Sequence, residues 1–346
     1  MKNVPKTMHA VLLTGHGGLE KLEYKTDISV PVPKDDEVLI KVSAAGVNNT
    51  DINTRTGWYS KSTNNDGSSW SGTPLKFPLI QGIDVCGTIV SVGSKINSSR
   101  IEERVIARPM QTDPKNPARP NMITLGSEID GAFTQYVAIR SSETFVINCK
   151  WTDAELGSIP CSYSTAEGLL HRVNLGAEKV FINGASGGVG SAAIQLAKRR
   201  GAHITAQCSS SKFNEIKKIG ANEVVSRETD LVKEIGKNKY DVVIDLVAGD
   251  KWMQLCEILK PGGRYATSGA IAGPIVSFDV RTLYLKDLTL YGCTYQSVEV
   301  FRNLIKYIEK GEIKPLVAKT YILKEIKKAQ EDFLLKKHVG KLVLFP

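Results

Sequence analysis

The sequence predicts an α/β protein with two domains, one a doubly wound parallel sheet and the other rich in β-strands. Residues 179–208 read as strand, glycine turn, helix and strand, and strands alternate with helices from Thr152 onward. The first half instead contains short β-branched or alternating runs broken by Gly, Pro and Asn. A chain of 346 residues exceeds what one core usually supports, so we expect two domains.

The glycine turn is the centre of the pattern. Val180–Ile182 reads as a buried parallel strand, Gly184–Gly190 makes the turn, a helix runs to about Arg200, and His203–Cys208 forms the next strand. This order places the pyrophosphate of a dinucleotide at a helix N-terminus. A tight turn with a purely structural role is the alternative.

The end of the second strand indicates which dinucleotide binds. An NAD site has a carboxylate there for the ribose hydroxyls. Here the strand ends in Cys208-Ser-Ser-Ser-Lys212, and the first acid is Glu215. Three hydroxyls and an ammonium suit a phosphate, which favours NADPH; a serine helix cap beside a solvated lysine is the alternative.

The first half is predicted to hold six strands, at residues 8–13, 37–45, 86–92, 104–107, 132–139 and 143–147. Two polar stretches interrupt them. Residues 60–76 look like a surface loop or lid, and residues 108–130, with four prolines, like a long excursion.

A helix over residues 152–172 begins the second half. The strands that follow are expected at residues 179–184, 203–208, 223–226, 241–247, 263–269 and 288–293, with helices between them. After a helix at 297–310, the tail ends in a strand, 341–345, that we expect to return to the first domain.

Charge, apolar runs and cysteine spacing indicate which partners and which compartment to expect. The net charge is +9, but the basic residues are spread along the chain, so an anionic dinucleotide explains them and no nucleic acid is expected. The apolar runs are broken before the ~18 residues of a membrane span, and the N-terminal residues lead into no signal-peptide core. We therefore expect a cytoplasmic protein without a membrane partner. The six cysteines never occur as Cys-x-x-Cys, which argues against a disulfide framework.

Several motifs resemble those of a known family. They include Val38-Leu-Ile-Lys-Val42, Ala45-Gly-Val-Asn48, Gly82-Ile-Asp-Val-Cys-Gly87, Gly184–Gly190, Gly262-Gly-Arg264 and Val339-Gly-Lys-Leu-Val-Leu344. On these motifs the chain resembles the medium-chain dehydrogenase/reductase superfamily, and within it the zinc-independent quinone oxidoreductases of the zeta-crystallin type. The resemblance implies a GroES-like substrate domain over residues 1–151 and 294–346, a Rossmann NADPH-binding domain over 152–293, and a cleft between them.

The metal-binding positions of the zinc-dependent relatives hold other residues here. Asn48 and Ile83 stand where those relatives have a cysteine and a histidine, Asp84 replaces their glutamate, and Cys161 alone looks like a ligand. A catalytic zinc needs about three protein ligands. We therefore expect no metal, and read Cys161 as a small core residue.

The resemblance also implies the site residues. NADPH would transfer a hydride to a quinone or another conjugated carbonyl, with Asn48 or Tyr59 contacting the acceptor. Asn48 as a turn residue and Tyr59 as a surface aromatic are the alternatives. The expected cofactor contacts are Ser186, Gly187, Gly188, Val189, Ser209, Lys212, Arg227, Val247, Ser268, Gly269, Ala270, Cys293, Thr294 and Tyr295. A homodimer or homotetramer is expected, because Leu288–Cys293 reads as an apolar edge strand and the family pairs there.

Other functions remain open at this point. The acceptor could be a 2-alkenal, an enone or an enoyl thioester. A short-chain dehydrogenase would fit the glycine spacing, but it needs Tyr-x-x-x-Lys, which this sequence lacks. Some relatives of the branch are non-catalytic structural or RNA-binding proteins that still bind NADPH, and the sequence does not separate them from the enzymes.

Overall fold

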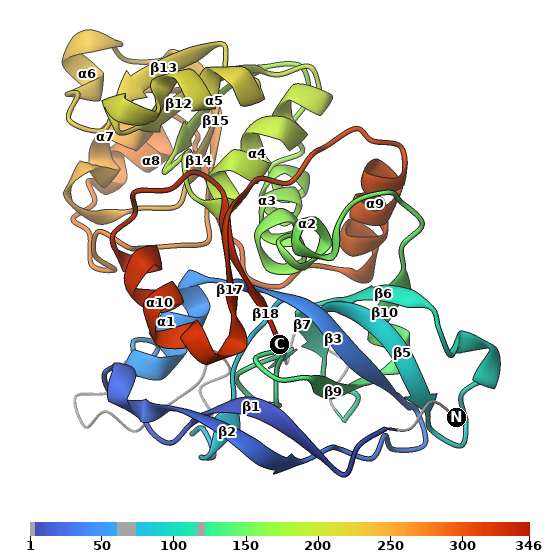
Figure 1. Cartoon of the computed structure of the whole chain (residues 1–346). Helices are drawn as coiled ribbons and strands as arrows, with labels where there is room; N and C mark the ends of the chain where they lie inside the picture. The colour runs from blue at the N-terminus through green and yellow to red at the C-terminus, as the bar shows by residue number, and fades with distance from the viewer. Residues whose placement is uncertain (1–3, 61–73, 116–121) are drawn as a thin grey trace. The chain divides into compact units, whose positions relative to one another are not determined.

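A computed structural model describes residues 4–60, 74–115 and 122–346 (Figure 1). Contacts divide the chain into two compact units. Unit 1 comprises Met1–Cys161, Pro315–Lys337 and Lys341–Pro346, and unit 2 comprises Ser162–Lys314 and His338–Gly340. The boundaries expected from the sequence were 151/152 and 293/294, so residues 152–161, 294–314 and 338–340 are assigned differently.

Unit 2 is built on a six-stranded sheet in the order β13-β12-β11-β14-β15-β16, with every pair parallel. Its strands are β11 (Lys179–Asn183), β12 (His203–Cys208), β13 (Glu223–Ser226), β14 (Tyr240–Asp245), β15 (Leu259–Thr267) and β16 (Thr289–Gly292). The chain order reverses beside β11, because β12 and β14 flank it. Ligands of such sheets bind at the carboxyl ends of the strands at this reversal. The predicted doubly wound sheet is confirmed.

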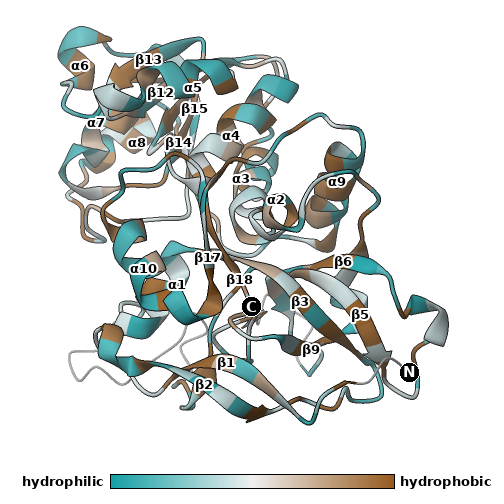
Figure 2. Cartoon of the chain, viewed as in Figure 1, coloured by the Kyte–Doolittle hydropathy of each residue, from teal (hydrophilic) through white to brown (hydrophobic). Residues whose placement is uncertain are grey.

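Helices precede, connect and follow these strands. They are α3 (Pro160–Arg172), α4 (Gly188–Arg199), α5 (Phe213–Ile219), α6 (Leu231–Glu234), α7 (Trp252–Glu257), α8 (Val280–Leu285) and α9 (Val298–Glu309). α9 is amphipathic, with Val300, Phe301, Leu304 and Ile308 buried, and Figure 2 shows its hydrophobic and hydrophilic residues. The chain after α9 is tied to unit 2, because Lys314 accepts from the Tyr163 hydroxyl and donates to Gln195.

The single helix predicted over residues 152–172 is wrong. The structure has two helices, α2 (Asp153–Gly157) and α3, with Ser158 and Ile159 between them. Pro160 opens α3, where its missing N–H costs nothing. A proline also disfavours helical geometry in the residue before it, which accounts for the break.

Unit 1 contains a sheet in the order β10-β6-β5-β3-β18-β17, with β9 also paired to β3, and two smaller sheets, β2-β1-β4 and β7-β8. The strands are β1 (Thr7–Leu13), β2 (Leu22–Ser29), β3 (Glu37–Val47), β4 (Leu79–Ile80), β5 (Cys86–Val92), β6 (Arg104–Ala107), β7 (Met110–Thr112), β8 (Met122–Thr124), β9 (Tyr136–Arg140), β10 (Thr144–Val146), β17 (Val317–Ile322) and β18 (Lys341–Phe345). The helices are α1 (Asn49–Thr56), α2 and α10 (Ile326–Leu334). β18 pairs antiparallel with β3, so the final strand joins the N-terminal sheet as its sequence predicted.

Five strands of unit 1 were not predicted: β2, β4, β7, β8 and β17. β4, β7 and β8 have only two or three residues each, and β7 and β8 lie within the excursion predicted over residues 108–130. β2 and β17 are mostly exposed and carry several charged or polar residues, so neither shows the alternation expected of a half-buried strand. Pairing with β1 and with β18 fixes them instead. Of the predicted loop over residues 60–76, the part 61–73 lies outside the described residues.

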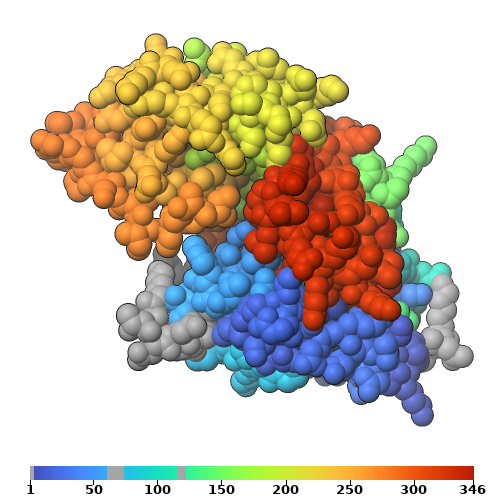
Figure 3. Space-filling view, turned by 60° about the vertical axis from the view of Figure 1, so that its left-hand side comes forward, coloured from blue at the N-terminus to red at the C-terminus, as the bar shows by residue number. Residues whose placement is uncertain are grey.

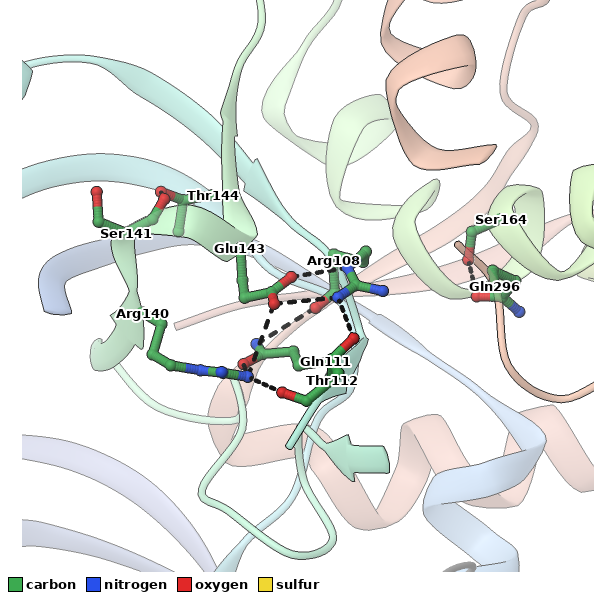
Figure 4. Close-up of polar contacts among 9 residues, drawn as sticks. All are labelled: Arg108, Gln111, Thr112, Arg140, Ser141, Glu143, Thr144, Ser164 and Gln296. Atoms are coloured by element: carbon green, nitrogen blue, oxygen red, sulfur yellow. Dashed lines mark hydrogen bonds and ion pairs between the residues drawn. The ribbon is translucent and has the colours of Figure 1, made fainter. Parts of the chain in front are cut away.

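A buried ion pair links two segments of unit 1, residues 108–112 and 140–143. Arg108 donates through Nε and Nη2 to the two carboxylate oxygens of Glu143, at 2.7 and 3.0 Å, and both side chains are buried (Figure 4). Arg140 extends the network to Gln111 and to the carbonyl of Thr112. The bidentate pair thereby joins Arg108, the residue after β6, to Glu143, the residue before β10.

We expect Arg108→Leu to lower the free energy of unfolding by about 3–5 kcal/mol, because it leaves the Glu143 carboxylate buried without its bidentate partner. Urea denaturation followed by intrinsic fluorescence measures this loss. Lys95→Met is the control, since the Lys95–Asp35 pair is exposed and should contribute less than about 1 kcal/mol. Equal effects of the two substitutions would contradict the role given to Arg108.

Candidate functional site

The glycine turn joins β11 to α4 in unit 2. Gly184 has φ +79°, a left-handed conformation that glycine adopts without strain. A Cβ at Gly190 would lie 2.2 Å from the carbonyl oxygen of Gly184 and 2.6 Å from the Cα of Ala185, so no larger residue fits there. Gly187 is the N-cap of α4, and a Cβ on it would meet nothing closer than 3.9 Å. The turn therefore brings helix and strand together and leaves open space in front of the helix end.

This helix end suits a diphosphate. The N–H groups in the first turn of a helix have no intrahelical acceptor, and the helix dipole favours an anion there. Gly188, Val189 and Gly190 supply those groups in α4. The hydroxyl of Ser186 lies in the same turn and accepts a hydrogen bond from Lys212 Nζ at 3.4 Å. The arrangement fits the dinucleotide that the sequence predicted.

Val247 and the residues expected on the nicotinamide side all follow the carboxyl ends of neighbouring strands. Val247 follows β14, Ser268–Ala270 follow β15, and Cys293–Tyr295 follow β16. Backbone hydrogen bonds join these segments, from Ala272 N to Val247 O and from Cys293 N to Thr267 O, both at 2.9 Å. The structure therefore brings these sequence-predicted residues to the same edge of the sheet as the glycine turn.

Two side chains at this edge have distinctive environments. The Ser268 hydroxyl is buried and has no hydrogen-bond partner in the described structure, which fits a donor or acceptor reserved for a ligand. Cys293 is buried as well, and burial raises the pKa of its thiol to about 11. Asp245 acts as a loop cap, since its carboxylate accepts from the backbone N–H groups of Val247 and Ala248 and from the Tyr265 hydroxyl.

The residues expected at the adenosine end gather where β12 and β13 end. Ser209 follows β12, and the backbone N–H of Arg227 donates to the carbonyl of Cys208 at 2.9 Å, which places the start of the next loop beside it. The Arg227 side chain is exposed and pairs with Glu228. A serine hydroxyl and a guanidinium thus lie at neighbouring strand ends.

Lys212 has a more enclosed position than the sequence suggested. Its side chain is buried, with the residue 8% exposed, and its ammonium donates to the carbonyl of His338 at 2.7 Å as well as to Ser186. Burial lowers the pKa of Lys212, and the charge of Arg227 acts in the same direction. The ammonium therefore lies beside the glycine turn, where a bound phosphate would stabilise its charge.

A separate set of buried polar groups lies in unit 1, around Asn48, the N-cap of α1. Its Nδ2 donates to Asp84 Oδ2 at 2.8 Å and to the Gly46 carbonyl at 3.2 Å, and its Oδ1 accepts from the ammonium of Lys341. That ammonium also donates to Asp84 Oδ2 at 2.9 Å. We call Asn48, Asp84 and Lys341 the amide cluster; they are 7%, 0% and 3% exposed. Both Nδ2 hydrogens of Asn48 are engaged within the protein.

Asp51 adds a second buried carboxyl beside the amide cluster. It accepts from the backbone N–H of Asn48 at 2.7 Å, which closes the first turn of α1. Burial raises the pKa of Asp51 to about 7, and the charge of Asp84 contributes, while the Asn48 N–H and the Lys341 ammonium oppose the shift. Lys341 is therefore the cation that acts on both carboxyl groups.

Tyr59, the other expected acceptor contact, lies beyond the opposite end of α1. Its hydroxyl donates to Thr50 Oγ1 at 3.2 Å and accepts from Asn53 Nδ2 at 3.4 Å. Its ring packs edge-on against Trp58, which is partly exposed. Asn48 and Tyr59 thus lie at the two ends of one short helix. Asn48 is buried among charged groups, whereas Tyr59 is half-buried beside an exposed tryptophan.

The positions that would bind zinc have no suitable donor set. Ile83 is buried and apolar, the Asp84 carboxylate is occupied by Lys341, Asn48 and the backbone N–H of Cys161, and the Cys161 side chain belongs to the unit 1 core. Across residues 4–60, 74–115 and 122–346, no group of three His, Cys, Asp or Glu side chains is placed to hold a metal ion.

Lys341 is the site residue that sequence reasoning missed. It was noted only as part of a family motif, although a lysine opens a strand whose other residues are Leu-Val-Leu-Phe. A charge at such a position is buried only when it has partners. A lysine at the start of an otherwise apolar strand was therefore the sequence feature that could have indicated a buried ion pair.

Comparison with known proteins agrees with this geometry. Residues 34–149 match the family model "Alcohol dehydrogenase GroES-like domain", and residues 188–310 match "Zinc-binding dehydrogenase". A quinone oxidoreductase from Sus scrofa is 28% identical, with 98% of each chain covered. An NADPH-dependent alkenal/one oxidoreductase from Arabidopsis thaliana is 29% identical, over 91% of this chain and 73% of its own.

Solved structures include a nearer relative. A candidate alcohol dehydrogenase from Sinorhizobium meliloti has 46% identity and a TM-score of 0.94, with 100% of this chain and 98% of its own covered. No helix within the described residues is long and apolar enough to cross a membrane. The full-length match and the two domain models together identify the chain as an oxidoreductase of the medium-chain dehydrogenase/reductase superfamily.

Proposed function

We propose that the protein is a zinc-independent, NADPH-dependent reductase that transfers a hydride to a quinone or another conjugated carbonyl. The observation that carries this proposal is the amide cluster. An ammonium from Lys341 neutralises Asp84 where metal-dependent relatives have zinc ligands, so the unit that would bind substrate already contains a protein cation. The quinone oxidoreductase and alkenal/one oxidoreductase relatives support the same chemistry.

When bound, NADPH supplies the hydride from C4 of its nicotinamide. The chain contributes binding and orientation. The first turn of α4 would hold the diphosphate, Ser209 and Lys212 would contact the 2′-phosphate, and Arg227 would lie near the adenine. The Ser268 hydroxyl is available to the nicotinamide side. Tyr59 is the candidate to donate a hydrogen bond to the acceptor, and Asn48 shapes the turn from which α1 begins.

The alkenal/one oxidoreductase relative favours a second acceptor class, 2-alkenals and enones. Both classes accept a hydride into a conjugated system, so one experiment separates them. Purified protein is assayed for NADPH oxidation with 1,4-quinones and with α,β-unsaturated aldehydes and ketones, and its zinc content is measured. We expect turnover with at least one class, far less than one zinc per chain, and no loss on EDTA treatment. No oxidation with any acceptor would overturn the proposed activity, and stoichiometric zinc lost together with activity would overturn the zinc-independent mechanism.

We expect the protein to prefer NADPH over NADH, and Lys212→Glu to weaken NADPH binding by roughly ten- to a hundredfold. A charge-assisted contact to phosphate contributes about 1.5–3 kcal/mol, and the glutamate adds repulsion. Isothermal titration with both cofactors measures the effect. NADH, which lacks the 2′-phosphate, should lose less.

Lys251→Met serves as the matched control for that titration. The Lys251 ammonium donates to the backbone carbonyls of Arg227 and Thr229 in the same loop, so this change removes one lysine charge nearby while Lys212 stays. The Lys251→Met variant should still prefer NADPH over NADH. Equal weakening of NADPH and NADH by Lys212→Glu would mean that Lys212 contacts a part shared by both, such as the diphosphate.

We also propose a homodimer formed through the β16 edge of unit 2. β16 ends the strand order of its sheet, and such an edge pairs readily with a copy of itself. The chain just before it exposes large apolar side chains, among them Ile275 at 87% and Leu285 at 70%. In Figure 3 this orange part of the chain lies at the molecular surface.

Light scattering should therefore give about twice the 37.8 kDa of one chain, or four times for a dimer of dimers. Leu285→Asp should shift the protein toward the monomer, because it places a charge in the apolar contact. Leu335→Asp, at an exposed leucine of unit 1, is the control and should leave the mass unchanged. A wild-type monomer at micromolar concentration would rule the edge contact out.

A further inference from the structure

We propose that Lys341 is a positioning residue for the hydride transfer: its buried ammonium fixes the Asn48 amide and, through it, the start of α1. The inference rests on the proposed function. It assigns a task to a residue that lies in a strand, outside the expected cofactor and acceptor contacts. Three features of the amide cluster support this role: the chemistry of its donors, its lack of space, and the elements that it connects.

The donors and acceptors of the cluster allow one orientation of the amide. An ammonium can only donate hydrogen bonds and a carboxylate can only accept them. With Lys341 on one side and Asp84 on the other, Asn48 must turn its oxygen to the lysine and its NH₂ to the aspartate. The Gly46 carbonyl also accepts from the NH₂ group. Removing the ammonium therefore leaves the Asn48 oxygen buried without the lysine donor that holds it.

The cluster has no room for a substitute. A Cβ at Gly46 would lie 2.4 Å from Asp84 Oδ2 and 3.0 Å from Lys341 Cε. Asp84 is fully buried, so its carboxylate depends on the partners present rather than on solvent. The Lys341 ammonium is therefore held between Asn48 Oδ1 and Asp84 Oδ2.

The cluster connects several elements of unit 1. Asp84 Oδ1 accepts from the backbone N–H of Cys161 near the start of α3, at 2.6 Å. Asn48 follows β3 and caps α1, and Lys341 is the first residue of β18. Tyr59 lies just beyond the C-terminal end of the same α1. Both candidate acceptor contacts, Asn48 and Tyr59, are thus attached to a helix whose first turn depends on Lys341.

Three variants test this role. Lys341→Met removes both the charge and the donor, whereas Lys341→Gln removes the charge and keeps an N–H donor. Lys341→Met combined with Asp84→Asn removes both charges, so that a folded protein is obtained even if the unpaired carboxylate of the single variant prevents folding. Lys319→Met, which breaks a partly exposed ion pair with Asp332 in the same unit, is the matched control.

Thermal unfolding and steady-state kinetics are measured for each variant. We expect the double variant to fold and to lose roughly ten- to a hundredfold in kcat, because a small displacement of contact residues is costly, while the KM for NADPH stays unchanged. Lys341→Gln should recover part of that kcat, and Lys319→Met should match the wild type. A double variant with wild-type kcat would overturn the proposal, and so would equal loss of kcat in Lys341→Gln and Lys341→Met. Either result would mean that Lys341 only balances the charge of Asp84.

Hydrogen–deuterium exchange distinguishes failure of this inference from failure of the proposed function. Loss of the Lys341 donor should speed exchange in residues 46–56 of the double variant relative to Lys319→Met, at temperatures where both remain folded. A wild-type protein inactive with every acceptor would overturn the proposed function. In that event, unchanged exchange at residues 46–56 would also overturn the structural part of the inference, and faster exchange would support it.

Discussion

The close approach of helix α4 to strand β11 is the constraint on which unit 2 depends. Only a residue without a side chain fits at Gly190, where a Cβ would lie 2.2 Å from the carbonyl of Gly184. Because the helix starts so near the strand, its unpaired N–H groups lie at the carboxyl edge of the sheet. The loops after β14, β15 and β16 end at the same edge, and Asp245 orders the first of them through its backbone hydrogen bonds.

Unit 1 depends on a different constraint, the pairing of its buried charges. Glu143 and Asp84 are buried carboxylates, and each is paired with a buried cation, Arg108 or Lys341. Such pairs contribute little net stability but make the loss of one partner expensive. They therefore restrict which local arrangements the surrounding loops can adopt. Around Asn48 this restriction coincides with the unit expected to meet the substrate.

The sequence predicted many strands of both units because their signals are local. β5, β6 and β18 of unit 1 and β12 and β13 of unit 2 were predicted at their observed bounds, and the glycine turn indicated the sheet edge where the cofactor is expected. β2 and β17 were missed because pairing, rather than their own pattern, makes them strands. The helix over residues 152–172 was wrong at Pro160, where the apolar pattern continues through a backbone break.

The candidate site also divides into residues that could be expected from the sequence and residues that meet only through long-range contacts. Residues at strand ends, such as Val247 and Ser268, were expected from the family resemblance, and the parallel sheet places them at the edge where the glycine turn lies. The amide cluster could not be predicted, because Asn48, Asp84 and Lys341 are up to 293 residues apart in sequence and meet through the pairing of β3 with β18 and with β5. The enclosure of Lys212 by the His338 carbonyl likewise depends on a segment more than 100 residues away.

The six cysteines carry a consequence for a protein that acts on electrophiles. Quinones and enones alkylate thiols, and the reactive form of a thiol is the thiolate. All six cysteines are free, and Cys149 alone among them is not buried. Burial raises the pKa of Cys256 to about 12 and that of Cys293, at the cofactor edge, to about 11. At neutral pH these two thiols stay protonated and buried, which would protect the proposed reductase from alkylation by quinone or enone acceptors.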